Sequence, residues 1–192
     1  MSKEYTDLTE HNHIMAPMPA QAMLIQQAAE FAQQAHHGQI RRGGAPYYTH
    51  VHRVAERVES PTADAHLTAA AYLHDTMEDC GVTAADIEAR FGLQIASLVQ
   101  ELTNDDALKD QLGKEEYMVR KLSAMSAPAL LIKLCDTLDN MTETDCAEQA
   151  LVYARIQQRL QQNPPPVWGD MHQCLSCRIL DTYATKFSNH GK

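Results

Sequence analysis

Apolar residues recur every three or four positions through most of this chain, and no segment shows the sustained two-residue alternation of a half-buried strand. The clearest case is "AQAMLIQQAAEFAQQAH", which begins at Ala20 and has apolar residues at 24, 25, 28, 31, 32 and 35. This spacing places the apolar side chains along one stripe of a helix. The pattern predicts an all-α fold, a compact orthogonal bundle of helices.

Glycine and proline mark where the helices end. The first helix is expected to end near Gly38, because "GQIRRGGAPYY" predicts a loop. A turn is expected at Ser60-Pro61, and Thr83 with Asp86 predicts a capping box at the start of a helix that stops at Gly92. "NPPP" forbids continuation of a late helix. The other helices are expected at residues 49–59, 64–78, 93–103, 114–125, 127–141, 145–162 and 169–187.

A chain of 192 residues is long enough for one well-buried domain and too short for two ordinary ones. We expect residues 1–18, which are mostly polar, to be a flexible leader and residues 19–192 to form a single domain. No segment reaches the length of a membrane span, and the N-terminus lacks the apolar core of a signal peptide. The expected compartment is therefore the cytoplasm, without a membrane partner.

The formal net charge of −9 argues against a general nucleic-acid binder, because such proteins neutralise phosphates with a basic surface. A small anionic ligand stays compatible with this charge, since Arg41 and Arg42 are gathered in one glycine-rich loop. The five cysteines form an odd set without a secretory signal, which favours reduced thiols over a disulfide framework. Nothing in the sequence indicates an oligomeric state.

The stretch "YLHDTMEDC" places an imidazole and three carboxylates on a helix that otherwise reads as apolar. On one continuous helix, the side chains of His74, Asp75, Glu78 and Asp79 would span an arc of roughly 140° and point into one cleft. Burial of these carboxylates without a positive partner would cost several kcal/mol, so we expect a cation there, most economically a divalent metal. The alternative is a solvated helix end with an acidic surface patch.

A metal site needs ligands from other segments. His50 follows the glycine-rich loop, and Asp136 lies in "LLIKLCDTLDNM", where Lys133 and Asn140 fall on the same side of the helix. Each residue also has an ordinary structural interpretation. His50 could be a hydrogen-bonded core or capping histidine, and Asp136 could be a surface residue paired with Lys133.

The order His50, His74-Asp75, Asp136 resembles the ligand set of HD-domain metal phosphohydrolases. Three blocks resemble the hydrolase domain of RelA/SpoT-type alarmone enzymes and cover about a third of the chain: "AHHGQIRRGGAPYYTHVHRVA", "AAYLHDTMEDCGVTAADIEARFGLQIASLVQELTND" and "LLIKLCDTLDNM". The resemblance implies a helical fold of the HD type. It also implies hydrolytic removal of the 3′-pyrophosphate of ppGpp or pppGpp, which releases pyrophosphate and GDP or GTP.

The same resemblance assigns roles to residues. It implies Mn²⁺ at His50, His74, Asp75 and Asp136, with Glu78 and Asp79 orienting or deprotonating the attacking water. Arg41 would contact the base, Arg42 the phosphates and Asn140 the ribose side, and we add Tyr47 and Lys133 as weaker substrate-binding candidates. Ligands of nitrogen and oxygen without a thiolate also suit Mn²⁺ on chemical grounds.

We therefore expect a stand-alone alarmone hydrolase, since the chain has no room for the synthetase and regulatory domains of the long relatives. The base is not fixed by the sequence. The alternatives are the same chemistry on ppApp or on a phosphorylated dinucleotide cofactor, and an HD-type nucleotide sensor without turnover. Three departures from the family pattern concern base and phosphate recognition more than the metal: Val51, Cys80 and the segment "MTETDC".

Overall fold

The chain folds as a set of helices in the computed structural model, which describes residues 19–187. The helices are α1 Ala20–Ala35, α2 Tyr48–Thr62, α3 Ala65–Leu73, α4 Thr76–Asp79, α5 Ala84–Phe91, α6 Leu93–Leu102, α7 Asp106–Leu112, α8 Lys114–Ala124, α9 Ala127–Glu143, α10 Ala147–Gln162 and α11 Asp170–Phe187. The described part of the chain contains no strand, which confirms the all-α prediction. The expected leader, residues 1–18, lies outside the described residues.

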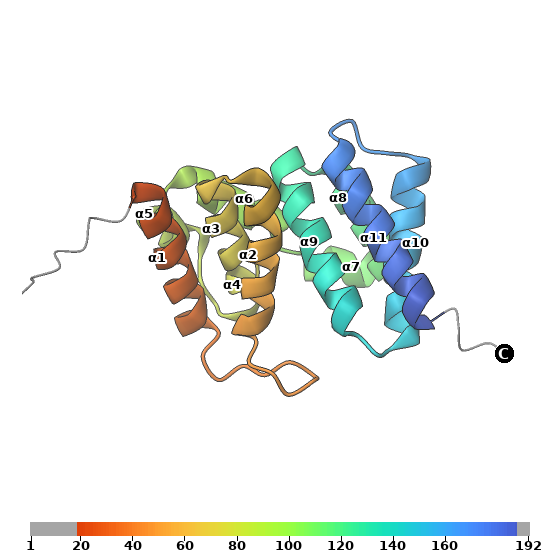
Figure 1. Ribbon diagram of the computed structural model, residues 1–192, viewed down its shortest axis with the longest axis horizontal. Coiled ribbons are helices and arrows are strands. Elements are labelled where there is room, and N and C mark those ends of the chain that lie inside the picture. Colours follow the sequence, from red (N-terminus) through yellow and green to blue (C-terminus); the bar gives the residue numbers. More distant parts are fainter. Residues whose placement is uncertain (1–18, 188–192) are drawn as a thin grey trace, which may run out of the picture.

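Helix α9 occupies the middle of the molecule (Figure 1). It packs against α2 and α6 on one side and against α10 and α11 on the other. Its apolar face is fully buried at Leu130 and Leu134, and Leu73 at the end of α3 is equally inaccessible. A polar side chain in the second half of α9 therefore lies where the two groups of helices meet.

The predicted helix starts and stops mostly agree with the structure. Thr83 and Asp86 form the expected capping box at the start of α5, and Gly92 ends that helix with a φ of 85°. A side chain would be strained at this φ, which explains the glycine between α5 and α6. The loop between α1 and α2 is also confirmed and protrudes from the bundle (Figure 1).

The predicted helix over 64–78 is wrong in one respect, because it is two helices. Helix α3 ends at Leu73, His74 and Asp75 lie outside both helices, and the single turn α4 follows. In a continued helix, the carbonyls of Ala71 and Leu73 would accept backbone N–H groups. Instead, the Ala71 carbonyl accepts a hydrogen bond from His74 Nδ1, and the Leu73 carbonyl accepts one from Thr76 Oγ1, each at 2.8 Å. The four side chains therefore do not lie on one continuous helix.

Two further boundaries differ from the prediction. Helix α2 runs through Pro61 to Thr62, where the Thr62 hydroxyl donates to the Val58 carbonyl at 2.7 Å and supports the last turn. Helix α7 was not predicted, because it is short and has no buried residue to give a periodic apolar pattern. No helix within residues 19–187 combines the length and apolar character needed to cross a membrane.

Candidate active site

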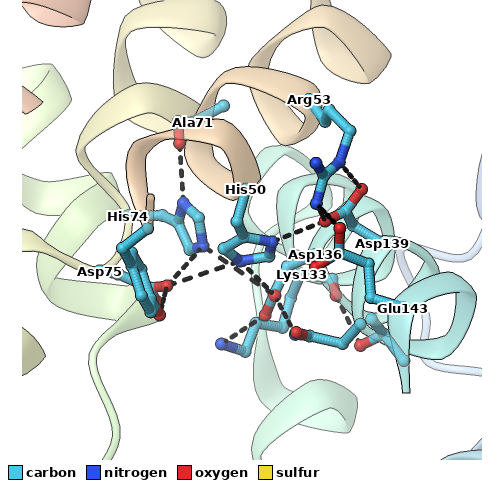
Figure 2. Close-up of polar contacts among 12 residues, drawn as sticks. His50, Arg53, Ala71, His74, Asp75, Lys133, Asp136, Asp139 and Glu143 are labelled. Carbon is cyan, nitrogen blue, oxygen red and sulfur yellow. Dashed lines mark hydrogen bonds and ion pairs between the residues drawn. The ribbon is translucent and has the colours of Figure 1, made fainter. Parts of the chain in front are cut away.

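Three of the four predicted metal ligands meet at the centre of the molecule. One nitrogen each from His50 and His74 and one oxygen from Asp136 lie within 4.8 Å of one another, and all three residues are buried. They come from α2, from the break after α3 and from α9, which are distant in sequence (Figure 2). The structure thus brings together three residues that are far apart in the sequence.

Both imidazoles are held so that Nε2 faces this cluster. His74 Nδ1 lies 2.8 Å from the Ala71 carbonyl, which can only accept, so this nitrogen carries the proton and Nε2 of the neutral ring is a lone-pair donor to a metal. His50 Nδ1 lies 2.8 Å from Asp139 Oδ2 and is fixed in the same way by a carboxylate. Figure 2 shows both rings turned toward Asp136. Carbonyl or carboxylate partners of this kind are typical of histidines that bind metal.

Asp139 is a site residue that the sequence analysis missed. It is fully buried, and its two oxygens accept hydrogen bonds from Arg53 Nε at 2.8 Å and Arg53 Nη2 at 2.9 Å. Arg57 Nη2 adds a longer contact of 3.3 Å. Burial on its own would raise the pKa of Asp139, but the hydrogen bonds and charges of His50 and Arg53 hold it below its usual range. Asp139 is therefore a charged anchor for the His50 ring. Its signal in the sequence was its spacing, three residues after Asp136 on one helix face.

Asp75, the fourth predicted ligand, approaches both imidazoles. Its Oδ2 lies 3.1 Å from His74 Nε2 and 3.7 Å from His50 Nε2. The Tyr47 hydroxyl donates to the same oxygen at 2.7 Å. Burial and the Asp75 carboxylate raise the pKa of Tyr47, so the hydroxyl stays protonated and remains a donor. Tyr47 thus positions a candidate ligand.

Asp136 is held by its neighbours on α9. Lys133 Nζ lies 2.9 Å from Asp136 Oδ2, and Asn140 Nδ2 donates to Oδ1 at 2.5 Å. Lys133 is buried, which lowers its pKa, but the charges of Asp136 and Asp75 outweigh burial and raise it. The ammonium therefore stays charged. The salt bridge expected as an alternative for Asp136 exists, but it lies inside the site instead of on the surface.

The residues fit a divalent cation. His74 Nε2 is buried and has no hydrogen-bond partner among the described residues, and the nearest oxygen, on Asp75, is itself an acceptor. Burial lowers the pKa of His50, but hydrogen bonds with Asp136, Asp139 and Asp75 raise it to about 10. In the metal-free protein a proton on His50 therefore meets part of the need for positive charge. A divalent metal ion would supply the remaining positive charge, and two imidazoles and two carboxylates are suitable ligands for it.

Glu78 and Asp79 line the same cavity as Asp75 and Asp136, two of the candidate metal ligands. This cavity has a volume of about 240 Å³, and its wall also includes five further predicted site residues: Tyr47, Asp75, Lys133, Asp136 and Asn140. The Glu78 carboxylate accepts two hydrogen bonds from Asn104, one from the backbone N–H at 2.6 Å and one from the side-chain amide at 3.1 Å. Both acids are exposed, so water can reach their carboxylates.

Arg41 and Arg42 line a second, outer cavity of about 550 Å³. The two cavities share Tyr47 and Asn140 on their walls. Arg41 Nη2 donates to Asn140 Oδ1 at 2.7 Å, so this arginine stands at the boundary between the cavities, whereas Arg42 is exposed. The structure thus separates the two arginines from the metal candidates and joins them through Asn140.

Comparison with known proteins agrees with this arrangement. A family model described as "HD domain" matches residues 28–163, which include every predicted site residue. The human protein named guanosine-3′,5′-bis(diphosphate) 3′-pyrophosphohydrolase MESH1 is 34% identical over 146 residues, covering 73% of this chain and 81% of that protein. An Aquifex aeolicus protein named guanosine-3′,5′-bis(diphosphate) 3′-pyrophosphohydrolase is 36% identical over 130 residues, which is 67% of this chain but only 19% of that longer protein.

Among solved structures, one described as a metazoan ortholog of SpoT that hydrolyses ppGpp superposes with a TM-score of 0.59. It has 26% sequence identity and covers 89% of this chain and 90% of its own. This chain therefore matches the short relatives along most of their length and the long bacterial relative over about a fifth of it. Because the family model spans well over half of the sequence, the chain belongs to the HD domain family.

Proposed function

We propose that this protein is a metal-dependent hydrolase that removes the 3′-pyrophosphate of ppGpp or pppGpp and releases pyrophosphate and GDP or GTP. The observation that carries the proposal is the buried group of His50, His74 and Asp136, in which His74 Nε2 has no hydrogen-bond partner among the described residues. Asp136 lies in the wall of a cavity that Glu78 and Asp79 also line. The relatives that match along most of their length are named as hydrolases of this nucleotide.

The proposed metal ligands are His50, His74, Asp75 and Asp136, and the proposed ion is Mn²⁺. The family implies a divalent metal, and a donor set of nitrogen and oxygen without sulfur suits a hard or borderline ion. When bound, the ion supplies Lewis acidity toward water and phosphate oxygens. Asp139 and the Ala71 carbonyl keep the two imidazoles in the tautomer that such binding needs.

In the reaction, water adds to the phosphorus attached to the ribose 3′ oxygen, and the bond between this phosphorus and the 3′ oxygen breaks. A proton leaves the water for the Glu78–Asp79 pair, and the departing 3′ oxygen takes up a proton. Asn104 fixes Glu78 through two hydrogen bonds, so the acceptor is in place before the substrate binds. Lys133 offsets negative charge beside Asp136, where charge gathers as the phosphorus is attacked.

The substrate is proposed to lie across both cavities. The inner cavity, at about 240 Å³, is smaller than the roughly 300–1,000 Å³ typical of sites that hold a whole drug-sized ligand. The base and ribose are therefore assigned to the outer cavity, where Arg41 can stack on a ring and Arg42 can reach phosphates. Tyr47 and Asn140 lie on the boundary between the cavities and would contact the ribose and its 3′ phosphate.

The test is product analysis by anion-exchange chromatography after incubation of the purified protein with Mn²⁺ and, separately, ppGpp and ppApp. We expect release of pyrophosphate that stops with a chelator and in Asp75→Asn, and that persists in Asp145→Asn, which changes an exposed aspartate. Faster turnover of ppApp would reassign the base. Binding of either nucleotide without turnover under saturating Mn²⁺ would make the protein a sensor. If neither nucleotide binds or is turned over, the next substrate to test is a phosphorylated dinucleotide cofactor.

The remaining features of the proposal follow from the sequence. We assign the enzyme to the cytoplasm and to a single hydrolase domain, residues 19–192, preceded by the leader. Its partner is a small nucleotide, not a nucleic acid, because the net charge is −9. Gel filtration of the full chain would give the oligomeric state.

A further inference from the structure

Gln157 on α10 is a polar residue of the inner cavity to which the proposed reaction has so far given no role. Its side chain is completely inaccessible to solvent, and it lines the same cavity as the candidate metal ligands Asp75 and Asp136. Neither its amide nitrogen nor its amide oxygen has a hydrogen-bond partner among the described residues. A buried amide without partners costs free energy, so such a group in a binding cavity indicates a ligand that satisfies it.

The part of the cavity formed by α8, α9 and α10 carries positive charge. Lys133 from α9 and Lys114 from α8 both line it. Lys133 Nζ lies 2.9 Å from Asp136 Oδ2, and the ammonium group has further N–H donors for another partner. Lys114 has its ammonium 4.7 Å from the centre of the Tyr153 ring, and the structure gives it no carboxylate partner within the described residues. Two cations and one amide therefore point to an anion with several oxygens.

Three of the four acidic groups that line the cavity come from other elements. Asp75, Glu78 and Asp79 belong to α4 and the residue before it, while Gln157 and Lys114 come from α10 and α8. The cavity thus joins an acidic side, which suits a metal and a water, to a side of donors that suits phosphate. Asp136 with Lys133 stands between the two.

We propose that Gln157, with Lys114 and Lys133, binds the distal phosphate of the 3′-diphosphate, the group that leaves as pyrophosphate. This inference rests on the proposed function for the identity of the ligand. The amide N–H₂ of Gln157 donates to phosphate oxygens, and its carbonyl accepts from a lysine ammonium that has turned toward the same phosphate. The residue binds substrate and takes no proton in the reaction.

The experiment compares two neighbouring glutamines of α10. Gln157→Leu removes the amide at similar volume, and Gln157→Glu places a negative charge beside the phosphate. Gln158→Leu and Gln158→Glu are the matched controls, because Gln158 is exposed on the same helix. Binding of methylenediphosphonate, a diphosphate that cannot be hydrolysed, and of GDP is measured by calorimetry at fixed free Mn²⁺, and hydrolysis of ppGpp is followed in parallel.

We expect both Gln157 variants to weaken methylenediphosphonate binding roughly 10- to 100-fold, the effect of a lost hydrogen bond to a charged group, with the glutamate variant the weaker binder. Binding of GDP should stay within about twofold, because GDP lacks the 3′-diphosphate. The melting temperature of Gln157→Leu should equal or exceed that of the wild type, since a buried amide without partners is replaced by an apolar group. A purely structural role would instead lower the melting temperature and leave diphosphonate affinity unchanged.

The two proposals fail in different ways. Wild-type protein that binds methylenediphosphonate through Gln157 but releases no pyrophosphate from ppGpp would overturn the proposed function and keep this site. Active wild-type protein in which the Gln157 and Gln158 variants bind methylenediphosphonate equally well would overturn the site and keep the function. Equal weakening of GDP and methylenediphosphonate would also overturn it, because the loss would not belong to the diphosphate.

Discussion

Replacement of Asp139 by asparagine tests whether the anchoring of His50 determines metal affinity. The carboxylate accepts from His50 on Oδ2 and from Arg53 on both oxygens. An asparagine offers one oxygen and one N–H₂ group, so in either orientation an N–H group faces a donor. If the N–H₂ faces His50, the imidazole proton moves to Nε2, and the lone pair needed by the metal is lost.

The size of the effect depends on the orientation that the amide of the new asparagine adopts. Arg53 and Arg57 both contact Oδ1, so keeping the oxygen there satisfies two arginines and turns the N–H₂ toward His50. We therefore expect Mn²⁺ affinity to fall about 10- to 100-fold, the range for the loss of a group that orients a metal ligand. This fall corresponds to about 1.4–2.7 kcal/mol of binding free energy. The loss should be in metal binding, with turnover at saturating metal reduced less.

The assay is titration of the purified variants with Mn²⁺, with free Mn²⁺ measured by electron paramagnetic resonance. Asp145→Asn is the control, because Asp145 follows α9 and its side chain is fully exposed. Thermal melting with chelator present would show that the metal-free variant is folded. Wild-type Mn²⁺ affinity in folded Asp139→Asn would refute the argument that this carboxylate sets the tautomer of His50.

Three more outcomes can be measured on the same protein. Arg41→Met should raise KM for ppGpp about tenfold or more with a smaller change in kcat, because Arg41 lines the outer cavity and not the metal group. Burial raises the pKa of the Cys135 thiol to about 12, so at pH 8 a disulfide reagent should label the exposed Cys174 and Cys177 first, and Cys135 only after unfolding, as mass spectrometry would show. The folded pKa of His50 is raised to about 10 in the metal-free protein, so its contribution to stability is complete below about pH 6.5. It should disappear as the pH rises toward 10, and urea unfolding of wild type and His50→Gln with chelator at pH 7 and pH 10 should show the difference between them shrinking.

Most helices were predictable because each buries a stripe of apolar residues that repeats at the helical period. The break between α3 and α4 was not predictable, because it depends on hydrogen bonds from the His74 and Thr76 side chains to backbone carbonyls. The apolar pattern continues through such a break without change. Pro61 was misjudged for a related reason, since a hydroxyl on the next residue supports the turn that proline weakens.

The candidate metal ligands could be proposed from residue type, order and resemblance, but their environment could not. Asp139 shares a helix face with Asp136 and Gln157 carries no motif, and the environment of each becomes clear only when α9 is placed against α2 and α10. Asp139 would read as an ordinary surface acid in the sequence, yet it is fully buried beside three cationic or donor groups. Gln157 would read as one of several glutamines on α10, yet it alone of these is buried in the cavity.

One face of α9 links the two cavities. Asp136, Asp139, Asn140 and Glu143 follow one another at helical spacing and lie on the same side of the helix. Asp136 and Asp139 hold His50, at 3.3 Å and 2.8 Å from its ring nitrogens, and Asn140 bonds to Asp136. The proposed metal ligand Asp136, the anchor of the His50 ring and the proposed nucleotide contact Asn140 thus lie on a single helix.

Glu143 connects Arg41 with Arg53 through two ion pairs. It pairs with Arg41 at 2.9 Å. It also pairs with Arg53, which in turn contacts Asp139 (Figure 2). Arg41 also donates to Asn140, so the path returns to Asp136. A nucleotide that draws Arg41 toward its base would loosen contacts on both branches, one through Asn140 to Asp136 and one through Glu143 and Arg53 to Asp139. If Arg41 and the metal ligands act as proposed, nucleotide binding and metal binding would be coupled through these shared side chains.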